Sequence, residues 1–160
     1  MKKVQGNTTV TLLECVNPVK DKWRVRWDVE KHEDGSADYM EEEFDGKPST
    51  DTIKVVVMRW INSQTEDAIR SGFVWNGLQV WLSQENQFNY KMAYDMAVQT
   101  EGRTLPVTFK LGTDTEPTYH TFTTLEELAD FYTKAMTHIQ QTLAEGWKKK
   151  DAFDQNKYGT

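Results

Sequence analysis

Cysteine and histidine are scarce in this sequence, which limits the covalent and metal chemistry open to it. Only one cysteine, Cys15, occurs among the 160 residues, so no disulfide can form within the chain. Its neighbours, TVTLLECVN, have the composition of a β-strand, and we expect a packed thiol in a reducing compartment. The three histidines fall in different predicted elements and lack the spacing of zinc ligands. The sequence therefore predicts no metal site.

Long apolar runs and an excess of positive charge are also missing. No run of 18 apolar residues occurs, and the opening MKKVQGNTTV has no apolar segment of the signal-peptide kind. We therefore expect a soluble product with no sign of export and no membrane partner. Acidic residues outnumber basic ones by 25 to 19, giving a formal charge of -6, which opposes attraction to phosphates. Duplex nucleic acid is accordingly not an expected partner.

Known reaction motifs are absent as well, including the G-x-S-x-G, P-loop and G-x-G-x-x-G patterns. The carboxylates at 41–43 and 126–127 lack apolar flanks that would raise a pKa for acid-base work. The first group reads as charge at a sheet edge, and the second as favourable charge at a helix N-terminus. His120 alternates with Thr118 and Phe122, which favours a hydrogen-bonding or exposed strand residue over a base. We expect no enzyme, no catalytic residue and no cofactor.

What the chain does contain is enough apolar and aromatic residues to fold. Aromatic residues make up 12% of it, and a chain of this length buries roughly 70% of its unfolded surface. In KWRVRWDVE, apolar residues from Trp23 to Val29 alternate with charged ones, the period of a half-buried strand. With TTVTLLECV before it and ADYMEEEF after Asp34-Gly35, it predicts an antiparallel three-stranded meander over residues 8 to about 44. We expect Trp23 and Trp27 in its core and the acidic third strand at its edge.

The next segment has the spacing of helices. Ser49 or Thr50 can cap a helix through DTIKVVVMRWIN, although the β-branched run weakens helical propensity. Ser63 and Glu66 match a capping box, which predicts a second short helix closed by Gly72. We therefore expect either a helical pair or one kinked helix.

FVWNGLQV predicts a hairpin with a type I′ turn at Asn76-Gly77, which sets Trp75 opposite Leu78 and Phe73 opposite Val80. Its second face offers Val74, Gln79 and Trp81, which leaves open that the hairpin is covered on both sides. Ser83 can then cap a helix from about Gln84 to Thr100, with Gly102 after its end.

A second hairpin is predicted in LPVTFKLGTDTEPTYHTFTT, with its polar turn at GTDTEP. Thr124 and Glu127 form a capping box for a long C-terminal helix, and Gly146 and the lysines at 148–150 suit its end. The expected fold class is α+β: an N-terminal antiparallel β-meander, then one or two helices, a β-hairpin, a helix, a β-hairpin and a long C-terminal helix. The expected parts are a meander appendage at 1–48, an α+β domain at 49–150 and a flexible tail at 151–160.

Amides gathered beside aromatic residues are the most informative feature for function. SQENQFNY places four amides within two helical turns, a mixture typical of recognition surfaces, and their concentration is not needed for folding. The alternative, a capped helix with a hydrated polar face, stays open. The candidate binding residues are Trp75, Asn76, Trp81, Asn86, Gln87, Asn89 and Tyr90.

Three motifs carry a resemblance to a known family: the SGFVWNG hairpin, LSQENQFNY and the FTTLEELADFYTKA helix. Over residues 50 to 152, the sequence resembles a small uncharacterised domain family of phages and prophages of gut bacteria. Members are found near tail-fibre genes and are similar to tail-fibre assembly proteins. The first 48 residues lie outside this resemblance and remain open as a docking piece.

The resemblance implies a non-enzymatic phage tail accessory protein, either a tail-fibre assembly chaperone or a tail adaptor. Its expected partner is a tail-fibre or baseplate protein, and a homo-oligomer is left open. The expected location is the host bacterial cytoplasm during assembly, with the virion tail as a second possibility. The alternative hypothesis is a phage-encoded binder of a host small molecule, such as a nucleotide, or of a host defence protein.

Overall fold

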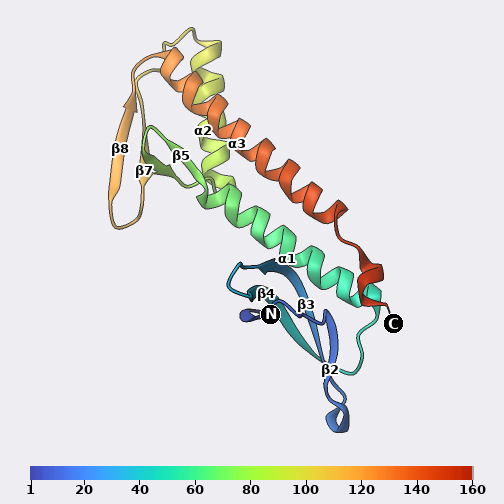
Figure 1. The fold of residues 1–160 in the computed structure, drawn as a ribbon. Helices are drawn as coiled ribbons and strands as arrows, with labels where there is room; N and C mark the ends of the chain where they lie inside the picture. Colours follow the sequence, from blue (N-terminus) through green and yellow to red (C-terminus); the bar gives the residue numbers. More distant parts are fainter. Residues whose placement is uncertain (160) are drawn as a thin grey trace. The chain divides into compact units, whose positions relative to one another are not determined.

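The computed structural model describes residues 1–159, which fold into two compact units (Figure 1). The first unit comprises Met1–Trp60 and the chain from Ala152 onward, and the second comprises Ile61–Asp151. The fold class is α+β, with the element order expected from the sequence: a sheet, a helix, a hairpin, a helix, a hairpin and a long helix. A division of the chain at residues 48 and 49 stays a prediction.

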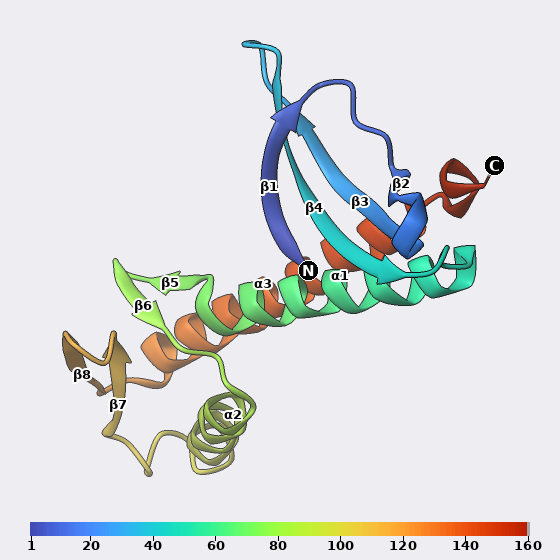
Figure 2. The same ribbon diagram turned by 90° about the horizontal axis from the view of Figure 1, so that it is seen from below.

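An antiparallel sheet of four strands forms most of the first unit, in the order β1-β4-β3-β2 (Figure 2). The strands are β1 (Lys2–Asn7), β2 (Leu13–Asn17), β3 (Lys22–Lys31) and β4 (Ser36–Asp45), with the 3₁₀ turn η1 (Pro18–Lys20) between β2 and β3. The expected meander of three strands therefore lacked one strand, β1. This polar segment pairs because its lysines meet acidic residues of β4: the Lys3 ammonium lies 3.2 Å from the Asp38 carboxylate.

The expectation that the acidic strand lies at an edge is wrong, because β4 runs between β1 and β3. Glu41 is only 4% exposed and accepts a hydrogen bond of 2.9 Å from Nε of buried Arg26. Arg26 Nη1 also donates to Glu14 Oε2 at 2.7 Å and to the Thr11 carbonyl at 2.9 Å. Burial alone would lower the pKa of Arg26, but hydrogen bonds with Glu41 and Glu14 outweigh it and raise the pKa. Part of the acidic run thus serves cross-strand pairing.

The expected alternation in β3 holds only as far as Trp27. Trp27 is buried and packs edge-on against Trp60, with ring centroids 6.2 Å apart, whereas Trp23 is half-buried. Asp28 then adopts a positive φ of 53°, and the register with β4 shifts before Glu30. This β-bulge ends the simple inward and outward alternation of side chains.

The C-terminal segment is ordered where a loose tail was expected. Residues Gln155–Tyr158 form a short 3₁₀ helix, η2, and the Tyr158 side chain is buried. Its hydroxyl donates to the Arg26 carbonyl at 2.9 Å, and burial raises the pKa of Tyr158 to about 12. The expected flexible tail at 151–160 is thus corrected over residues 155–158, while residue 160 lies outside the described residues.

Helix α1 (Thr50–Ser71) is one continuous helix that contributes residues to both units (Figure 1). Ser49 caps it as expected, since its Oγ accepts from the Thr52 N–H at 3.1 Å. The expected pair or kink is wrong: Ser63 and Glu66 lie inside the helix. No proline or glycine interrupts it, and burial at helical spacing outweighs the weak propensity of the β-branched run. The buried residues are Ile53, Val56, Val57 and Ile61.

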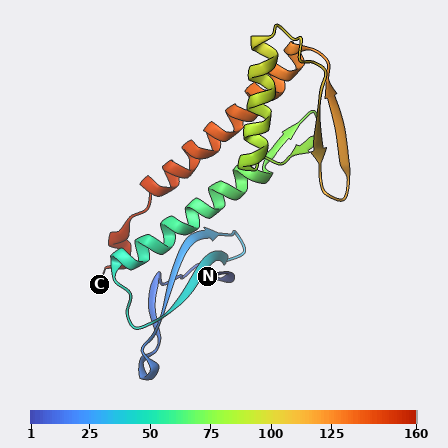
Figure 3. The same cartoon turned by 180° about the vertical axis from the view of Figure 1, so that it is seen from behind.

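Two hairpins and two further helices complete the second unit. They are β5 (Phe73–Trp75), β6 (Leu78–Val80), α2 (Gln84–Gln99), β7 (Val107–Gly112), β8 (Pro117–Phe122) and α3 (Leu125–Asp151). Helices α2 and α3 lie side by side, with Tyr94 and Tyr132 stacked at 4.6 Å, and Figure 3 shows the two hairpins next to each other. Aromatic residues dominate the core, including Phe73, Trp75, Tyr90, Phe109, Phe122 and Phe131.

The first hairpin has the expected turn and pairing. Asn76 and Gly77 have φ values of 48° and 79°, as a type I′ turn requires, and Trp75 pairs with Leu78. The second face is not covered, because Val74 and Trp81 are exposed. The suggestion that both faces are covered is therefore wrong.

Helix α3 begins as expected, and the lysines at 148–150 lie in its last turn as expected, but Gly146 does not end it. Thr124 Oγ1 accepts from the Glu127 N–H at 3.2 Å, but the Glu127 carboxylate pairs with His120 Nε2 at 2.9 Å instead of completing a capping box. Gly146 lies inside the helix and is buried. A Cβ at this position would lie 2.5 Å from Thr65 Oγ1, so glycine permits the close approach of α1 and α3 here.

Candidate functional site

Two of the seven candidate binding residues belong to the core. Trp75 is buried, donates from Nε1 to Asp130 Oδ2 at 3.0 Å, and meets the Phe131 ring edge-on at 5.4 Å. Tyr90 is also buried, with its ring centroid 4.6 Å from that of Phe109, and burial raises its pKa. The expectation that Trp75 and Tyr90 lie on a binding surface is corrected by their packing in the core.

Two candidate amides hold the loop that leads into α2. Asn86 Nδ2 donates to the Trp81 carbonyl at 2.8 Å, and Gln87 Nε2 donates to the Leu82 carbonyl at 2.8 Å. Ser83 Oγ accepts from the Asn86 N–H at 3.2 Å and so caps the helix as expected. The view that these amides are not needed for folding is therefore wrong for Asn86 and Gln87, which satisfy loop carbonyls.

The remaining three candidates lie at the surface. Asn76 occupies the left-handed position of the hairpin turn, and Asn89 is exposed on α2. Trp81 is 48% exposed, and the Arg70 guanidinium lies 5.8 Å from the centroid of its indole. A large aromatic surface held by a cation and still open to solvent is suited to ligand contact.

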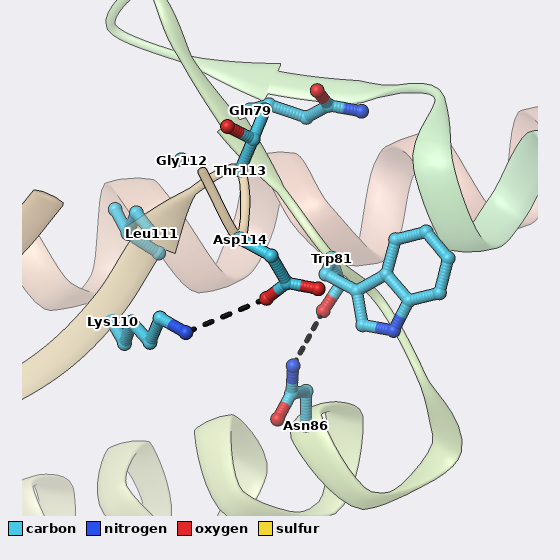
Figure 4. Close-up of a pocket in the computed structure, with 8 residues that line it drawn as sticks. All are labelled: Gln79, Trp81, Asn86, Lys110, Leu111, Gly112, Thr113 and Asp114. Atoms are coloured by element: carbon cyan, nitrogen blue, oxygen red, sulfur yellow. Dashed lines mark hydrogen bonds and ion pairs between the residues drawn. The ribbon is translucent and has the colours of Figure 1, made fainter. Parts of the chain in front are cut away.

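Trp81 and Asn86 help to line a cavity of about 380 Å³ in the second unit (Figure 4). One side comes from the end of the first hairpin and the start of α2, and the other from β7 and the turn after it. The side chains that define it are Gln79, Trp81, Asn86, Lys110, Leu111 and Asp114. Leu111 is almost wholly buried and provides an apolar wall. The volume lies within the range of small-ligand sites.

The polar groups of this cavity are only partly used by the protein itself. Lys110 Nζ lies 3.5 Å from Asp114 Oδ1 (Figure 4), longer than the usual 2.7–2.9 Å of a charge-assisted hydrogen bond. Gln79 Nε2 donates to the Ser71 carbonyl at 3.0 Å, which leaves its amide oxygen as an acceptor. The cavity thus combines an aromatic wall, an apolar wall, two amides and one loosely paired lysine and aspartate.

Sequence reasoning missed the half of the cavity that comes from the second hairpin. The turn GTDTEP was recognised as polar, but nothing in it indicated a site with Trp81. Gln87, in contrast, lines a separate groove of about 800 Å³ with Arg70 and the apolar residues Leu82 and Ile139. The seven candidates are therefore divided among the core, the turn, the cavity, the groove and the surface of α2.

The outer face of α2 carries three exposed apolar side chains. Phe88, Met92 and Met96 are 63%, 45% and 43% exposed, and their spacing of four residues puts them on one face. Buried Tyr90 and Ala97 lie on the opposite face. We call the three residues the α2 stripe. Exposed Asn89 follows Phe88 directly and precedes Met92 by three residues, so it borders this stripe on the helix surface.

Other reactive side chains form no comparable site within residues 1–159. No group of three or more histidine, cysteine or acidic residues there is arranged to hold a metal ion, and no described helix is both long and apolar enough to cross a bilayer. His120 is hydrogen-bonded to Glu127, as expected of a strand residue, and Cys15 is partly exposed in β2.

The fold and the cavity define an α+β protein with a small surface site of aromatic, amide and charged side chains. A family model described as "Domain of unknown function (DUF4376)" matches residues 52–159, more than half of the chain. The protein belongs to this family. Comparison with curated proteins found no match, and comparison with solved structures found none.

Proposed function

We propose that the protein is a non-enzymatic accessory protein of a phage tail that works by binding another protein. It serves as a tail-fibre assembly chaperone or as a tail adaptor, and its partner is a tail-fibre or baseplate protein. It acts in the host bacterial cytoplasm during assembly or in the virion tail. The resemblance of residues 50 to 152 to a family found near tail-fibre genes supports this context.

The observation that carries protein binding is the α2 stripe. A folded protein in water gains free energy when such side chains leave the solvent, and full burial of one Met or Phe contributes about 1.5–3 kcal/mol. Phe88, Met92 and Met96 are apolar, adjacent and uncovered by the rest of the second unit. Phenylalanine and methionine are also enriched in protein interfaces. A segment of the fibre or baseplate protein would pack across this stripe, with Asn89 as a polar contact beside it.

The test is capture of the fibre and baseplate proteins encoded beside this gene, using the wild type and Met92→Glu. The introduced charge should weaken capture at least about tenfold, because a carboxylate cannot be buried against an apolar partner without a large cost. Val55→Glu is the matched control, since Val55 is also an exposed apolar residue on a helix. Its capture should equal that of the wild type.

Failure to capture any fibre or baseplate protein, together with absence from purified virions, would refute the proposal. Equal weakening by Met92→Glu and Val55→Glu would refute the role of the stripe. Sedimentation of the protein alone distinguishes a further outcome: a dimer lost in Met92→Glu would mean that the stripe joins two copies of this chain instead.

A further inference from the structure

The cavity beside Trp81 has no role in the proposed protein contact and has the properties of a separate ligand site. Its flat apolar surface comes from the half-exposed Trp81 indole, and Leu111 adds a buried apolar wall. Arg70 contacts the same indole but lines the neighbouring groove, so it fixes the ring from outside the cavity. The indole is therefore a preorganised platform, which lowers the entropy lost when a ligand binds.

Hydrogen-bonding groups of both kinds stand around this platform. Asn86 uses Nδ2 to hold the Trp81 carbonyl, which fixes the amide and leaves Oδ1 as an acceptor. The fully exposed Asp114 carboxylate adds two acceptor oxygens, and Lys110 adds donors. Because Lys110 and Asp114 are 3.5 Å apart, both retain capacity for a ligand. Neighbouring donor and acceptor groups match a ligand whose polar groups both donate and accept.

The charge of the lining selects a neutral ligand. Lys110 is the cation and Asp114 the anion among the lining residues, so their charges cancel. A phosphate would meet Asp114 and a protein of net charge -6, whereas a ligand cation would meet Lys110. A nucleotide is thus disfavoured, although a small host molecule as ligand was one hypothesis from the sequence.

Among neutral ligands, a sugar fits better than a nucleobase. A nucleobase is a flat ring that gains most when it stacks between planar groups, but among the described residues Trp81 is the one aromatic side chain that lines the cavity. A sugar ring packs its C–H face on one indole and directs hydroxyls outward, and each hydroxyl both donates and accepts. Lys110 can donate to one hydroxyl while Asp114 accepts from its neighbour.

We propose that the cavity formed by Trp81, Asn86, Lys110 and Asp114 binds a neutral saccharide, with the sugar ring on the Trp81 indole and its hydroxyls on the polar side chains. No chemical step is involved. The site is independent of the α2 stripe, since none of the three stripe residues lines the cavity.

Saturation-transfer NMR with the full chain tests this directly. The probes are the methyl glycosides of glucose, galactose, N-acetylglucosamine and rhamnose, each at millimolar concentration. Adenosine and AMP are tested in the same way as ligands of a different chemical class. We expect saturable binding of at least one glycoside and weaker or no binding of adenosine and AMP. Trp81→Ala should weaken glycoside binding about tenfold or more. Trp147→Ala removes an exposed tryptophan near the C-terminal end of α3 that does not line the cavity, and it should leave glycoside binding unchanged.

Two further variants separate loss of the site from loss of the fold. Trp81→Phe keeps an aromatic platform and should retain most of the binding. Asp114→Ala changes a fully exposed side chain and should reduce binding while the amide spectrum stays that of the wild type. Met92→Glu should bind the glycoside normally, so failure of this proposal is distinguishable from failure of the protein contact. Binding of no glycoside, tighter binding of adenosine or AMP, or equal losses in Trp81→Ala and Trp147→Ala would overturn the proposal.

Discussion

Replacing Glu41 by glutamine tests whether the acidic strand β4 is stabilised by a buried ion pair. Glu41 accepts from Arg26 Nε at 2.9 Å, and both side chains are nearly excluded from solvent. Breaking a buried pair costs about 3–5 kcal/mol when it leaves a charge without compensation. Arg26 keeps Glu14 at 2.7 Å and the Thr11 carbonyl at 2.9 Å, and glutamine retains one acceptor oxygen. We therefore expect a smaller loss, about 2 kcal/mol.

Glu14→Gln is the matched control, because it changes the second carboxylate on the same arginine. The Glu14 side chain is 44% exposed, so water can replace much of its interaction and the expected loss is about 0.5–1 kcal/mol. A urea titration followed through the NMR amide signals of β3 and β4 reports the stability of the first unit. A loss for Glu41→Gln below about 0.5 kcal/mol, or no larger than for Glu14→Gln, would refute the buried pair as a source of stability for β4.

Two further substitutions test the packing of each unit. Gly146→Ala should lower the free energy of unfolding by about 1 kcal/mol, because overpacking against Thr65 outweighs the gain in helix propensity. Adding Thr65→Ala to the same chain should recover most of the loss. Thermal unfolding measures both effects, and a Gly146→Ala variant more stable than the wild type would contradict the prediction. The pKa of Tyr158 is raised in the folded protein, so the Tyr158 hydroxyl contributes fully to the free energy of unfolding below its usual pKa of 10. This contribution is lost as the pH rises towards about 12. Tyr158→Phe should lower the free energy of unfolding by about 1 kcal/mol near neutral pH, and the variant should lose less stability than the wild type between pH 10 and about 12. Equal losses of stability over this pH range in denaturant titrations of the wild type and the variant would contradict the prediction.

Features that depend on neighbours in sequence were predictable. A two-residue type I′ turn requires positive φ at both central positions, which Asn76 and Gly77 adopt readily, so the turn and its pairing followed together. Ser83 and Thr124 were recognised as helix caps because a short hydroxyl side chain reaches an N–H three residues later. Each of these signals acts within a few residues.

Features that depend on strand order were not predictable. The alternation in β3 predicts that the Arg26 side chain points outward. ADYMEEEF has the acidic composition of an edge strand, and nothing in the sequence shows that another strand pairs with its free side. The N-terminal β1 and the Arg26–Glu41 pair together put β4 in the centre. Similarly, Ser63 and Glu66 form a valid capping box by local rules, but burial along α1 keeps the helix continuous.

Only one side of the candidate site was predictable, because only that side is formed by residues close together in the sequence. Trp81 and Asn86 lie five residues apart in one segment, and the aromatic and amide composition of that segment pointed to them. Lys110 lies in β7 and Asp114 in the turn after it, and they meet Trp81 and Asn86 only through the packing of β6 beside β7. One sequence gives no means of pairing two distant loops, since either turn alone is an ordinary polar connection.

The difference between Trp75 and Trp81 is determined by the length of one turn. Side chains alternate along a strand, and a two-residue turn reverses which alternate positions point inward. Phe73 and Trp75 therefore face the core together with Leu78 and Val80, which leaves Val74, Gln79 and Trp81 on the outer face. If the turn also took in Leu78, Gln79 would pair with Trp75 and the two faces of the second strand would exchange. Trp81 would then point inward, and its indole would leave the cavity. The Asn76-Gly77 turn thus both closes the hairpin and makes Trp81, rather than a residue beside it, the exposed platform of the proposed site.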